Sequence, residues 1–398
     1  MGEPVWIAWS AGPDDQTSHA SPITPVRYST GYEAGMALIL AGIDEAGYGP
    51  LLGPMCVGMS VFRVEDAPSD TRQANALDPP CLWERLAPQI SRSPRGPASK
   101  GQARKLASKF ATPPVAIGDS KKLKLANSAV RLHPLTHLER GVLAMLRSCS
   151  VGAHECASIP ADDAALLARL GTVLSGHECY GGEPIALPLE GTAGQLSIAG
   201  NLASSTLARG GVGVVAMRCT AIDERQFNTI ATREGSKAAV TAHALGGFLG
   251  ELWHGHVGKG DDVLLVCDRL GGRASYGELL AGLMRQIEPG GVVRVVSQSE
   301  RRSEYVIEGA RGSAQVTFEV ESEEANLPVA LASMIAKLVR ELAMMRFNRY
   351  WAERFARARG STVELKPTAG YRNDGWRWLK DASDVIGSDD RRALVREF

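Results

Sequence analysis

Carboxylates stand at three separate places in the sequence from which they could reach one common site. Asp44 and Glu45 close an apolar, strand-like run, Asp268 closes a second such run, and Glu341 lies on a long segment with helical apolar spacing. Like charges brought together repel unless cations compensate them, so a shared site would need bound metal. Two Mg²⁺ ions about 4 Å apart would compensate the charge, activate water and stabilise the leaving oxygen of a phosphodiester. Magnesium prefers carboxylate and water oxygens, which fits these ligands.

Glycines directly follow the first acid pair, in the segment Gly42-Ile43-Asp44-Glu45-Ala46-Gly47-Tyr48-Gly49-Pro50. Adjacent side chains on a strand point to opposite faces, so both acids can serve one site only at a strand end. Glycines just beyond that end let the backbone approach a ligand closely. The segment is therefore a candidate for both metal and substrate contacts.

A row of phosphate-binding side chains is predicted on the helix that carries Glu341. Ser333 and Lys337 precede it at four-residue spacing, so all three share one helical face. A hydroxyl, an ammonium and a carboxylate in one row suit phosphate contacts that run toward a metal ligand. Two further segments support this set. Residues 118–123 place a predicted helix cap beside Lys121 and Lys122, and Gly370-Tyr371 offers an aromatic ring that could stack on a sugar or base.

Each feature has an ordinary structural explanation when it is taken alone. An Asp-Glu pair ends many strands, and an Asp before Gly271 and Gly272 could cap a helix or a turn. A Lys–Glu pair at four-residue spacing is usually a solvated ion pair worth roughly 0.2–0.5 kcal/mol. The joint occurrence of these features is what favours a metal-dependent nuclease.

The elements that must position these residues are strands mixed with helices, which indicates an α/β or α+β domain on one sheet. Strands are predicted at residues 37–44, 55–63, 211–222, 263–268, 292–297 and 314–320, and helices at 233–253, 276–287 and 327–351, with a final helix in the tail. Residues 136–210 are Gly-rich, and no element is assigned to them. We predict a disordered leader at 1–35, a catalytic domain at 36–352 with insertions near 64–115 and 139–209, and a substrate-contacting extension at 353–398.

Composition narrows the class of protein. The chain has 398 residues, 44% of them hydrophobic and 22% charged, which is ordinary for a globular protein. The formal net charge of zero excludes a uniformly basic DNA-coating protein, but it does not exclude a local basic patch. Residues 92–131 hold ten Lys or Arg against one acid, so this stretch is either a solvated face or a phosphate contact. No apolar run approaches the roughly 18 residues of a membrane span, and no secretory signal is visible, so a cytoplasmic protein is expected.

Seven cysteines at irregular spacing argue against a disulfide framework. Five potential zinc ligands do cluster in the sequence: Cys149, His154, Cys156, His177 and Cys179. Because no CxxC pair is present, ordinary cysteines are preferred to a structural zinc site. A nucleotide-binding enzyme is also disfavoured, since the sequence has neither a GxxxxGK[ST] loop nor a strand–GxGxxG–helix unit.

The order of the motifs resembles that of ribonuclease HII, the type 2 ribonuclease H family. The matching segments are Asp44 to Pro50, Asp119 to Leu123, Asp268 at its strand end, Ala332 to Glu341, and Gly370-Tyr371. The similarity covers about half of the chain. It implies a ribonuclease H-like fold, with a mixed central sheet, flanking helices and, here, large insertions. It also implies cleavage of the RNA strand of RNA–DNA hybrids, 5′ to a ribonucleotide, leaving 5′-phosphate and 3′-hydroxyl ends.

Roles carried over from the family fall on eleven positions. The resemblance implies that Asp44, Glu45, Asp268 and Glu341 bind Mg²⁺ or Mn²⁺ and are catalytic. It implies that substrate is bound by Gly47, Tyr48, Gly49, Lys121, Ser333, Lys337 and Tyr371. The expected partner is an RNA–DNA hybrid or a ribonucleotide-containing duplex, bound by a monomer that takes part in ribonucleotide excision and primer removal. No membrane partner is expected.

Two residues depart from the family pattern. Tyr48 replaces an Arg between the two glycines, and Glu341 replaces an Asp. The longer Glu side chain could shift a metal ion and favour Mn²⁺. Both departures motivate an alternative, a catalytically weakened member that binds hybrid nucleic acid without cutting it. The two hypotheses differ in whether the four carboxylates converge within metal-bridging distance.

Overall fold

The computed structural model describes residues 37–65, 72–73, 76–77, 79–94, 112–149, 158–174, 176–269, 275–360 and 363–397. All of these lie within one compact unit, Tyr32–Phe398. The predicted leader at 1–35 lies outside the described residues, as do His154, Cys156, Gly271 and Gly272. No helix in this part of the chain is long and apolar enough to cross a membrane.

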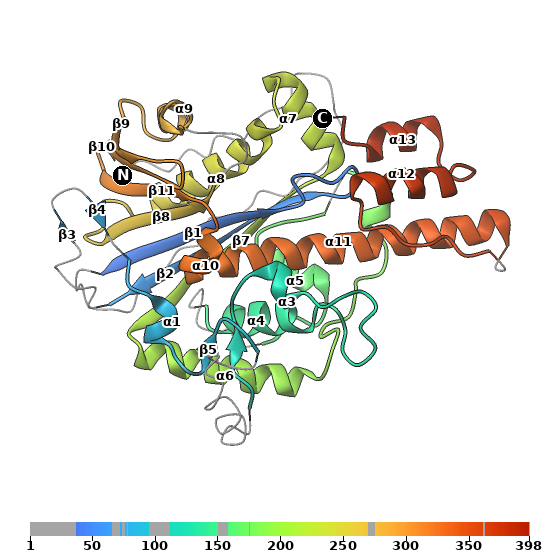
Figure 1. Ribbon diagram of the computed structural model, residues 1–398, viewed down its shortest axis with the longest axis horizontal. Helices are drawn as coiled ribbons and strands as arrows, with labels where there is room; N and C mark the ends of the chain where they lie inside the picture. Colours follow the sequence, from blue (N-terminus) through green and yellow to red (C-terminus); the bar gives the residue numbers. More distant parts are fainter. Residues whose placement is uncertain are drawn as a thin grey trace, which may run out of the picture. The chain divides into compact units, whose positions relative to one another are not determined.

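Seven strands form a central mixed sheet in the order β7-β2-β1-β8-β11-β10-β9 (Figure 1). Their bounds are β1 Leu38–Ala46, β2 Met55–Val64, β7 Val212–Ile222, β8 Asp262–Asp268, β9 Val292–Gln298, β10 Arg302–Gly309 and β11 Gly312–Glu319. β1, β2 and β7 are antiparallel neighbours, whereas β8 runs parallel to both β1 and β11. β9 and β10 continue the sheet as antiparallel strands beyond β11. A mixed central sheet flanked by helices confirms the predicted fold class.

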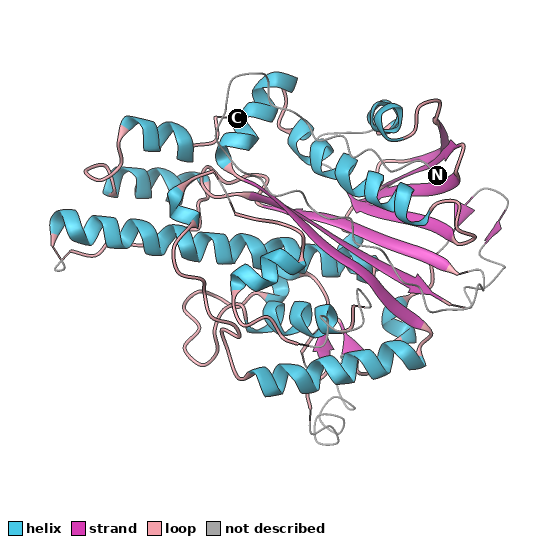
Figure 2. Ribbon diagram, turned by 180° about the vertical axis from the view of Figure 1, so that it is seen from behind, coloured by secondary structure: helices cyan, strands magenta, loops and turns pink. Residues whose placement is uncertain are grey.

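Helices cover both faces of this sheet (Figures 1 and 2). The longer ones are α4 Thr136–Arg147, α6 Ala193–Arg209, α7 Glu224–Glu234, α8 Ala238–His256, α9 Gly277–Ile287 and α11 Leu327–Arg359. The shorter ones are α1 Leu82–Arg85, α3 Ser120–Leu123, α5 Asp163–Arg169, α10 Ser322–Ala325, α12 Arg372–Asp381, α13 Ser388–Leu394 and the 3₁₀ helix η2 Glu178–Tyr180. The short strand pairs are β3 Arg72–Gln73 with β4 Ala76–Leu77, and β5 Ile90–Ser91 with β6 Val115–Ala116.

Alternate residues of β1 enter two different cores, which explains why its sequence is apolar throughout. Leu38 and Leu40 pack with α4, α6 and α11 in the first core, whereas Ile39, Ala41 and Ile43 pack with α7, α8 and α9 in the second core. A strand buried on both faces has no polar side and reads as a continuous hydrophobic run. The acids that follow are therefore the first polar side chains at the end of this strand.

Glycines bring α11 close to the sheet. A Cβ atom on Gly42 would lie 2.2 Å from the backbone of Pro328 and Val329, and one on Gly58 would lie 2.2 Å from the carbonyl oxygen of Ala332. Only residues without a side chain allow this approach. The same helix face carries Ser333, so the close packing places this hydroxyl beside the end of β1.

Most predicted elements are present, and several observed elements were not predicted. The helix predicted at 233–253 is observed as α8, which begins only at Ala238, because Gly235 takes a left-handed conformation (φ 65°) that ends the separate, unpredicted helix α7. β10 was not predicted, although Ser303, Tyr305 and Ile307 alternate as buried residues along it. Residues 136–210, to which no element was assigned, contain α4, α5 and α6.

Candidate metal centre

Three carboxylates from three elements converge at one edge of the sheet. One carboxylate oxygen from each of Asp44, Asp268 and Glu323 lies within 4.8 Å of the others. Asp44 lies near the end of β1 and Asp268 ends β8, and these strands are parallel neighbours with Ile43 in register with Cys267. Glu323 lies on α10, which begins soon after β11 on the other side of β8. Ligands of open sheets gather at the carboxyl ends of strands, and this group lies at such ends.

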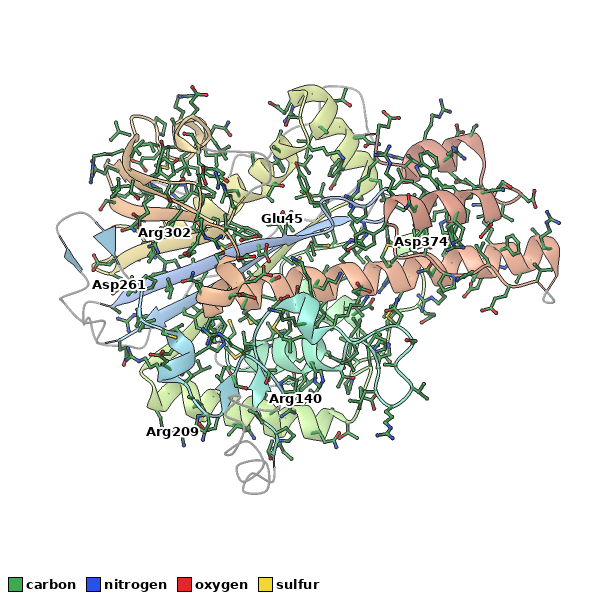
Figure 3. All side chains as sticks on the ribbon, in the orientation of Figure 1. Glu45, Arg140, Arg209, Asp261, Arg302 and Asp374 are labelled. Atoms are coloured by element: carbon green, nitrogen blue, oxygen red, sulfur yellow. The ribbon has the colours of Figure 1, made fainter. Side chains whose placement is uncertain are left out.

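Glu45 adjoins this group from the next position on β1, where it is labelled in Figure 3. Its backbone N–H donates a 2.7 Å hydrogen bond to Oδ1 of Asp44, which helps to hold the neighbouring carboxylate in place. Burial and, after it, the charge of Asp268 raise the pKa of Glu45 from 4.5 to about 7. Both acids of the pair therefore belong to one electrostatic site, as a strand end permits.

Among the residues that the structure describes, little positive charge balances these carboxylates. Burial raises the pKa of Asp44 well above its usual value, and the charges of Glu45, Asp268 and Glu323 raise it further. Burial likewise raises the pKa values of Asp268 and Glu323. Lys121 is a nearby cation, with its Nζ atom 3.8 Å from Oε1 of Glu323, but its side chain is 82% exposed. A divalent cation held by these oxygens would relieve the repulsion, so the donor set fits Mg²⁺ or Mn²⁺.

Hydrogen bonds hold the acids in place. The N–H of Ser322 donates to Oδ1 of Asp268 at 3.2 Å, and this bond fixes α10 to the end of β8. A hydrogen bond from Ser333 lowers the pKa of Asp44 in part, against the larger effect of burial. Oγ of Ser333 is also 3.0 Å from Oγ of Ser120, and this hydrogen bond between two hydroxyl groups connects α11 to α3. The predicted site residue Ser333 thus lies beside the carboxylates.

The predicted helix cap beside the lysines is present. Oδ1 of Asp119 accepts hydrogen bonds from the N–H groups of Lys121 (2.8 Å) and Lys122 (3.4 Å) and begins α3. The charge of Glu323 is the largest cause of the raised pKa of Lys121. α3 therefore presents the Lys121 ammonium at the edge of the carboxylate group.

Glu341 lies in different surroundings from the other predicted metal ligands. Its Oε1 atom is 2.9 Å from Nζ of Lys124 and 3.2 Å from Nζ of Lys337. Burial alone would raise its pKa, but the two lysines bring the pKa below its usual value. Glu341 is not among the residues whose carboxylate oxygens meet around Asp44.

Glu323 was missed by the sequence reasoning, although a signal for it exists. The run 319–324 contains four acids and directly follows a strand-like segment. Asp44 and Asp268 also stand at the ends of such segments. Without knowledge that β11 pairs with β8, nothing in the sequence places that strand end beside Asp268.

The predicted substrate-binding loop and Tyr371 lie side by side. The N–H groups of Leu51 and Leu52 both donate to the carbonyl of Gly370, at 2.8 and 3.1 Å. Gly47 has φ +88°, and a Cβ there would lie 2.4 Å from Nε of Arg340, whereas Gly49 faces open space. Tyr48 packs partly against the second core, and Tyr371 is 50% exposed.

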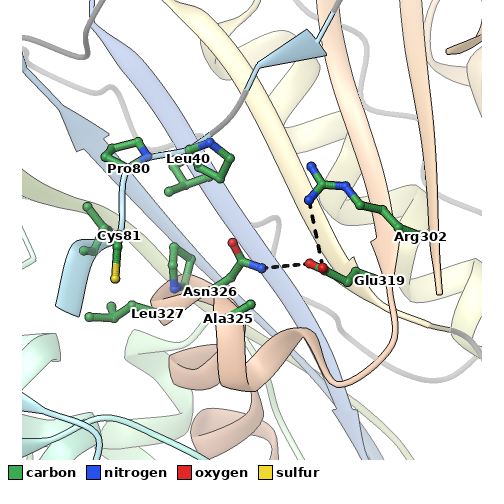
Figure 4. A pocket seen from close by; sticks show the side chains of 11 residues that line it. Leu40, Pro80, Cys81, Arg302, Glu319, Ala325, Asn326 and Leu327 are labelled. Carbon is green, nitrogen blue, oxygen red and sulfur yellow. Dashed lines mark hydrogen bonds and ion pairs between the residues drawn. The ribbon is translucent and has the colours of Figure 1, made fainter. Parts of the chain in front are cut away.

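A separate cavity of about 150 Å³ lies near the start of α11 (Figure 4). Leu40, Cys81, Arg302, Glu319 and Asn326 contribute to its wall. Nδ2 of Asn326 donates to Oε2 of Glu319 at 3.2 Å, and Nη1 of Arg302 is 3.9 Å from Oε1 of Glu319. None of the predicted site residues lines this cavity, so it is distinct from the carboxylate group.

No family model matches the sequence, and no curated protein matches it either. Among solved structures, the PCNA:RNase HII complex from Archaeoglobus fulgidus is 14% identical with a TM-score of 0.35, covering 90% of this chain and 94% of that chain. Bst-RNase HIII in complex with Mn²⁺ is 15% identical with a TM-score of 0.36, covering 91% of this chain and 67% of that one. The ribonuclease H2 from Pyrococcus horikoshii OT3 is 12% identical with a TM-score of 0.30, covering 87% and 97%. Similarities this low establish neither the family nor the activity of this chain.

Proposed function

We propose that this protein is a metal-dependent endonuclease that hydrolyses the RNA strand of RNA–DNA hybrids and cuts 5′ to ribonucleotides embedded in DNA. The convergence of Asp44, Asp268 and Glu323 beside Glu45 carries the proposal. Buried carboxylates that repel one another are costly to folding unless they serve a bound cation. Their place within the ordered motifs that resemble ribonuclease HII supports the choice of nucleic acid substrate.

The metal ligands in this proposal are Asp44, Glu45, Asp268 and Glu323. Bound Mg²⁺ or Mn²⁺ would supply activation of water and stabilisation of the leaving 3′-oxygen. Glu323 takes the fourth position that the sequence suggested for Glu341, because its carboxylate is in reach of the others. Glu341 instead holds Lys124 and Lys337, and thereby directs two cations to one side of α11.

The chain's own residues bind and orient the substrate around this centre. Lys121 and Lys337 neutralise backbone phosphates, and Ser333 fixes the carboxylate of Asp44 by hydrogen bonding. The backbone of Gly47 to Gly49 and the ring of Tyr371 contact the ribose at the cleavage position. Cutting on its 5′ side leaves a 5′-phosphate and a 3′-hydroxyl. A cytoplasmic, monomeric enzyme of ribonucleotide excision and primer removal remains our prediction from the sequence.

The binding-only alternative loses one of its two motives. It rested on Glu341 and Tyr48 as departures at the site, and in this proposal Glu323 supplies the fourth carboxylate in place of Glu341. Tyr48 keeps the backbone between the two glycines and lacks only the cationic side chain. No observation on the site favours binding without cleavage.

The test is cleavage of a labelled duplex that contains one ribonucleotide, in Mg²⁺ and in Mn²⁺. We expect metal-dependent cutting on the 5′ side of the ribonucleotide and a loss of roughly 10²–10³-fold in Asp44→Asn, as for removal of a central electrostatic group. Asp389→Asn is the matched control, because this exposed residue of α13 lies outside the proposed site. If the wild-type chain binds the duplex but cuts it in neither metal, the nuclease proposal is wrong.

A further inference from the structure

The loop that follows the acid pair, residues 47–53, is held from several sides by segments distant in sequence. Its Leu51 and Leu52 N–H groups bind the carbonyl of Gly370. The N–H of Gly53 donates to Oε1 of Glu224 at 2.8 Å, and that carboxylate also accepts from the hydroxyl of Tyr180 at 2.6 Å. These contacts fix the N–H side of the loop, and a different residue binds its carbonyl side.

Arg396 binds three carbonyl groups of this loop. Its guanidinium Nη1 donates to the carbonyl of Gly47 at 2.5 Å, and Nη2 donates to the carbonyl of Gly53. Its backbone N–H donates to the carbonyl of Leu51 at 3.0 Å. The residue is only 3% exposed, so these contacts lie beneath the loop and not on its outer surface.

The contact with Gly47 determines the direction of the next N–H group. In a trans peptide, the C=O of one residue and the N–H of the following residue point in opposite directions. Since Arg396 binds the Gly47 carbonyl on the buried side, the N–H of Tyr48 is directed to the other side of the same peptide. Leu51 and Leu52 show the same arrangement, with Arg396 on the carbonyl and Gly370 on the N–H.

Arg396 is itself anchored by α7. Nδ2 of Asn228 donates to the carbonyl of Val395 at 2.8 Å, and the N–H of Glu397 donates to Oδ1 of Asn228 at 3.0 Å. The guanidinium also lies 4.6 Å from the centroid of the Phe227 ring. The two residues that flank Arg396 are thus bound to one Asn side chain, which sets the position of its backbone.

We propose that Arg396 is a positioning residue that orients the Gly47–Tyr48 peptide toward the ribose of the substrate. This inference rests on the proposed function, because the loop matters for catalysis only if it contacts a ribonucleotide. The residue acts through the loop and touches neither substrate nor metal. Its removal leaves the carboxylates in place but frees the peptide to rotate.

The experiment compares Arg396→Met, Arg396→Lys and the control Leu143→Ala. Leu143 is a fully buried residue of α4 in the first core, so its truncation lowers stability without removing a loop contact. Kinetics on the single-ribonucleotide duplex are measured well below each melting temperature, together with amide hydrogen exchange of residues 47–53. We expect kcat to fall roughly 10–100-fold in Arg396→Met with less change in KM, since small misplacements cost this much.

Partial rescue is expected in Arg396→Lys, because one ammonium can reach one carbonyl but not span two. Exchange in the loop should rise in Arg396→Met and not in Leu143→Ala. If both variants lose stability to a similar extent and neither kcat nor loop exchange differs between them, Arg396 is only structural and the inference is wrong. If the wild-type chain cuts no ribonucleotide duplex, the proposed function fails, and unchanged loop exchange in Arg396→Met would separately refute the positioning role.

Discussion

Two acidic sites lie near α11, the carboxylate group around Asp44 and the single carboxylate of Glu341, and they differ in how their charge is balanced. Around Asp44, four carboxylates face one exposed lysine, and their pKa values are raised. Around Glu341, one carboxylate contacts Lys124 and Lys337, and its pKa is lowered. Among the described residues, the first group has too little positive charge to balance it without a bound cation, whereas the second already has two ammonium groups.

This difference separates a candidate metal centre from an ion-pair network. Residue type and spacing do not separate them, because both groups contain a Glu near motif residues. The direction of the pKa shift reports the balance between burial and neighbouring charge, and that balance has opposite signs in the two places. Three changes test whether the comparison holds.

Glu323→Gln should have the largest effect. Removing one charge from the carboxylate group should weaken metal binding and reduce cleavage by roughly 10²-fold, as for other groups that stabilise the transition state. Glu324→Gln is the matched control, because this neighbour pairs with exposed Lys122. Cleavage by both variants is measured over a range of metal concentrations. Equal activity of the two variants would indicate that Glu341, and not Glu323, is the fourth metal ligand.

The metal-free protein should lose stability as the pH rises from about 5 to about 7. A carboxyl group whose pKa is raised on folding binds its proton more tightly in the folded state, so ionisation near neutral pH destabilises that state. For Glu45, whose pKa rises from 4.5 to about 7, the loss is on the order of 2 kcal/mol. Mn²⁺ or Mg²⁺ should restore it.

Melting temperatures across this pH range, with and without metal, check the prediction. Glu139 also contributes to the loss of stability over this pH range, because burial raises its pKa to about 7 as well. Since Glu139 lies on α4 and accepts hydrogen bonds from the N–H groups of Leu189 and Glu190, its share of the loss should persist with metal and disappear in Glu139→Gln. A stability profile that metal leaves unchanged would contradict a metal role for the carboxylate group.

Glu341→Gln should have the smallest effect on chemistry. We expect kcat within about threefold of wild type, a raised KM as Lys124 and Lys337 lose their shared partner, and an unchanged metal dependence. Because the pKa of Glu341 is lowered, its contribution to stability is present above its unfolded value and is lost as the pH falls. The cost at neutral pH should be about 1 kcal/mol. Kinetics and thermal melts measure these changes, and a shifted metal optimum would show that Glu341 is a ligand after all.

Local patterns were enough for much of the fold and part of the site. The runs before Asp44 and Asp268 are apolar because their strands are buried on both faces. The sequence therefore predicted both strands and the positions where they end. Ser333, Lys337 and Glu341 do share a helix, since four-residue spacing fixes this without tertiary information. The break at Gly235 was misjudged because a single glycine is compatible with either a helix interior or its end.

Tertiary structure alone decided which acids meet. The sequence determined that strand ends carry carboxylates and glycines, but strand order placed β8 between β1 and β11 and so brought Glu323 to Asp268. It also placed Lys124 against Glu341, across 217 residues of sequence, and Arg396 beneath the glycine loop. Periodicity reports on neighbours within one element, whereas long-range partners depend on how elements pack, and charge balance follows only from those partners.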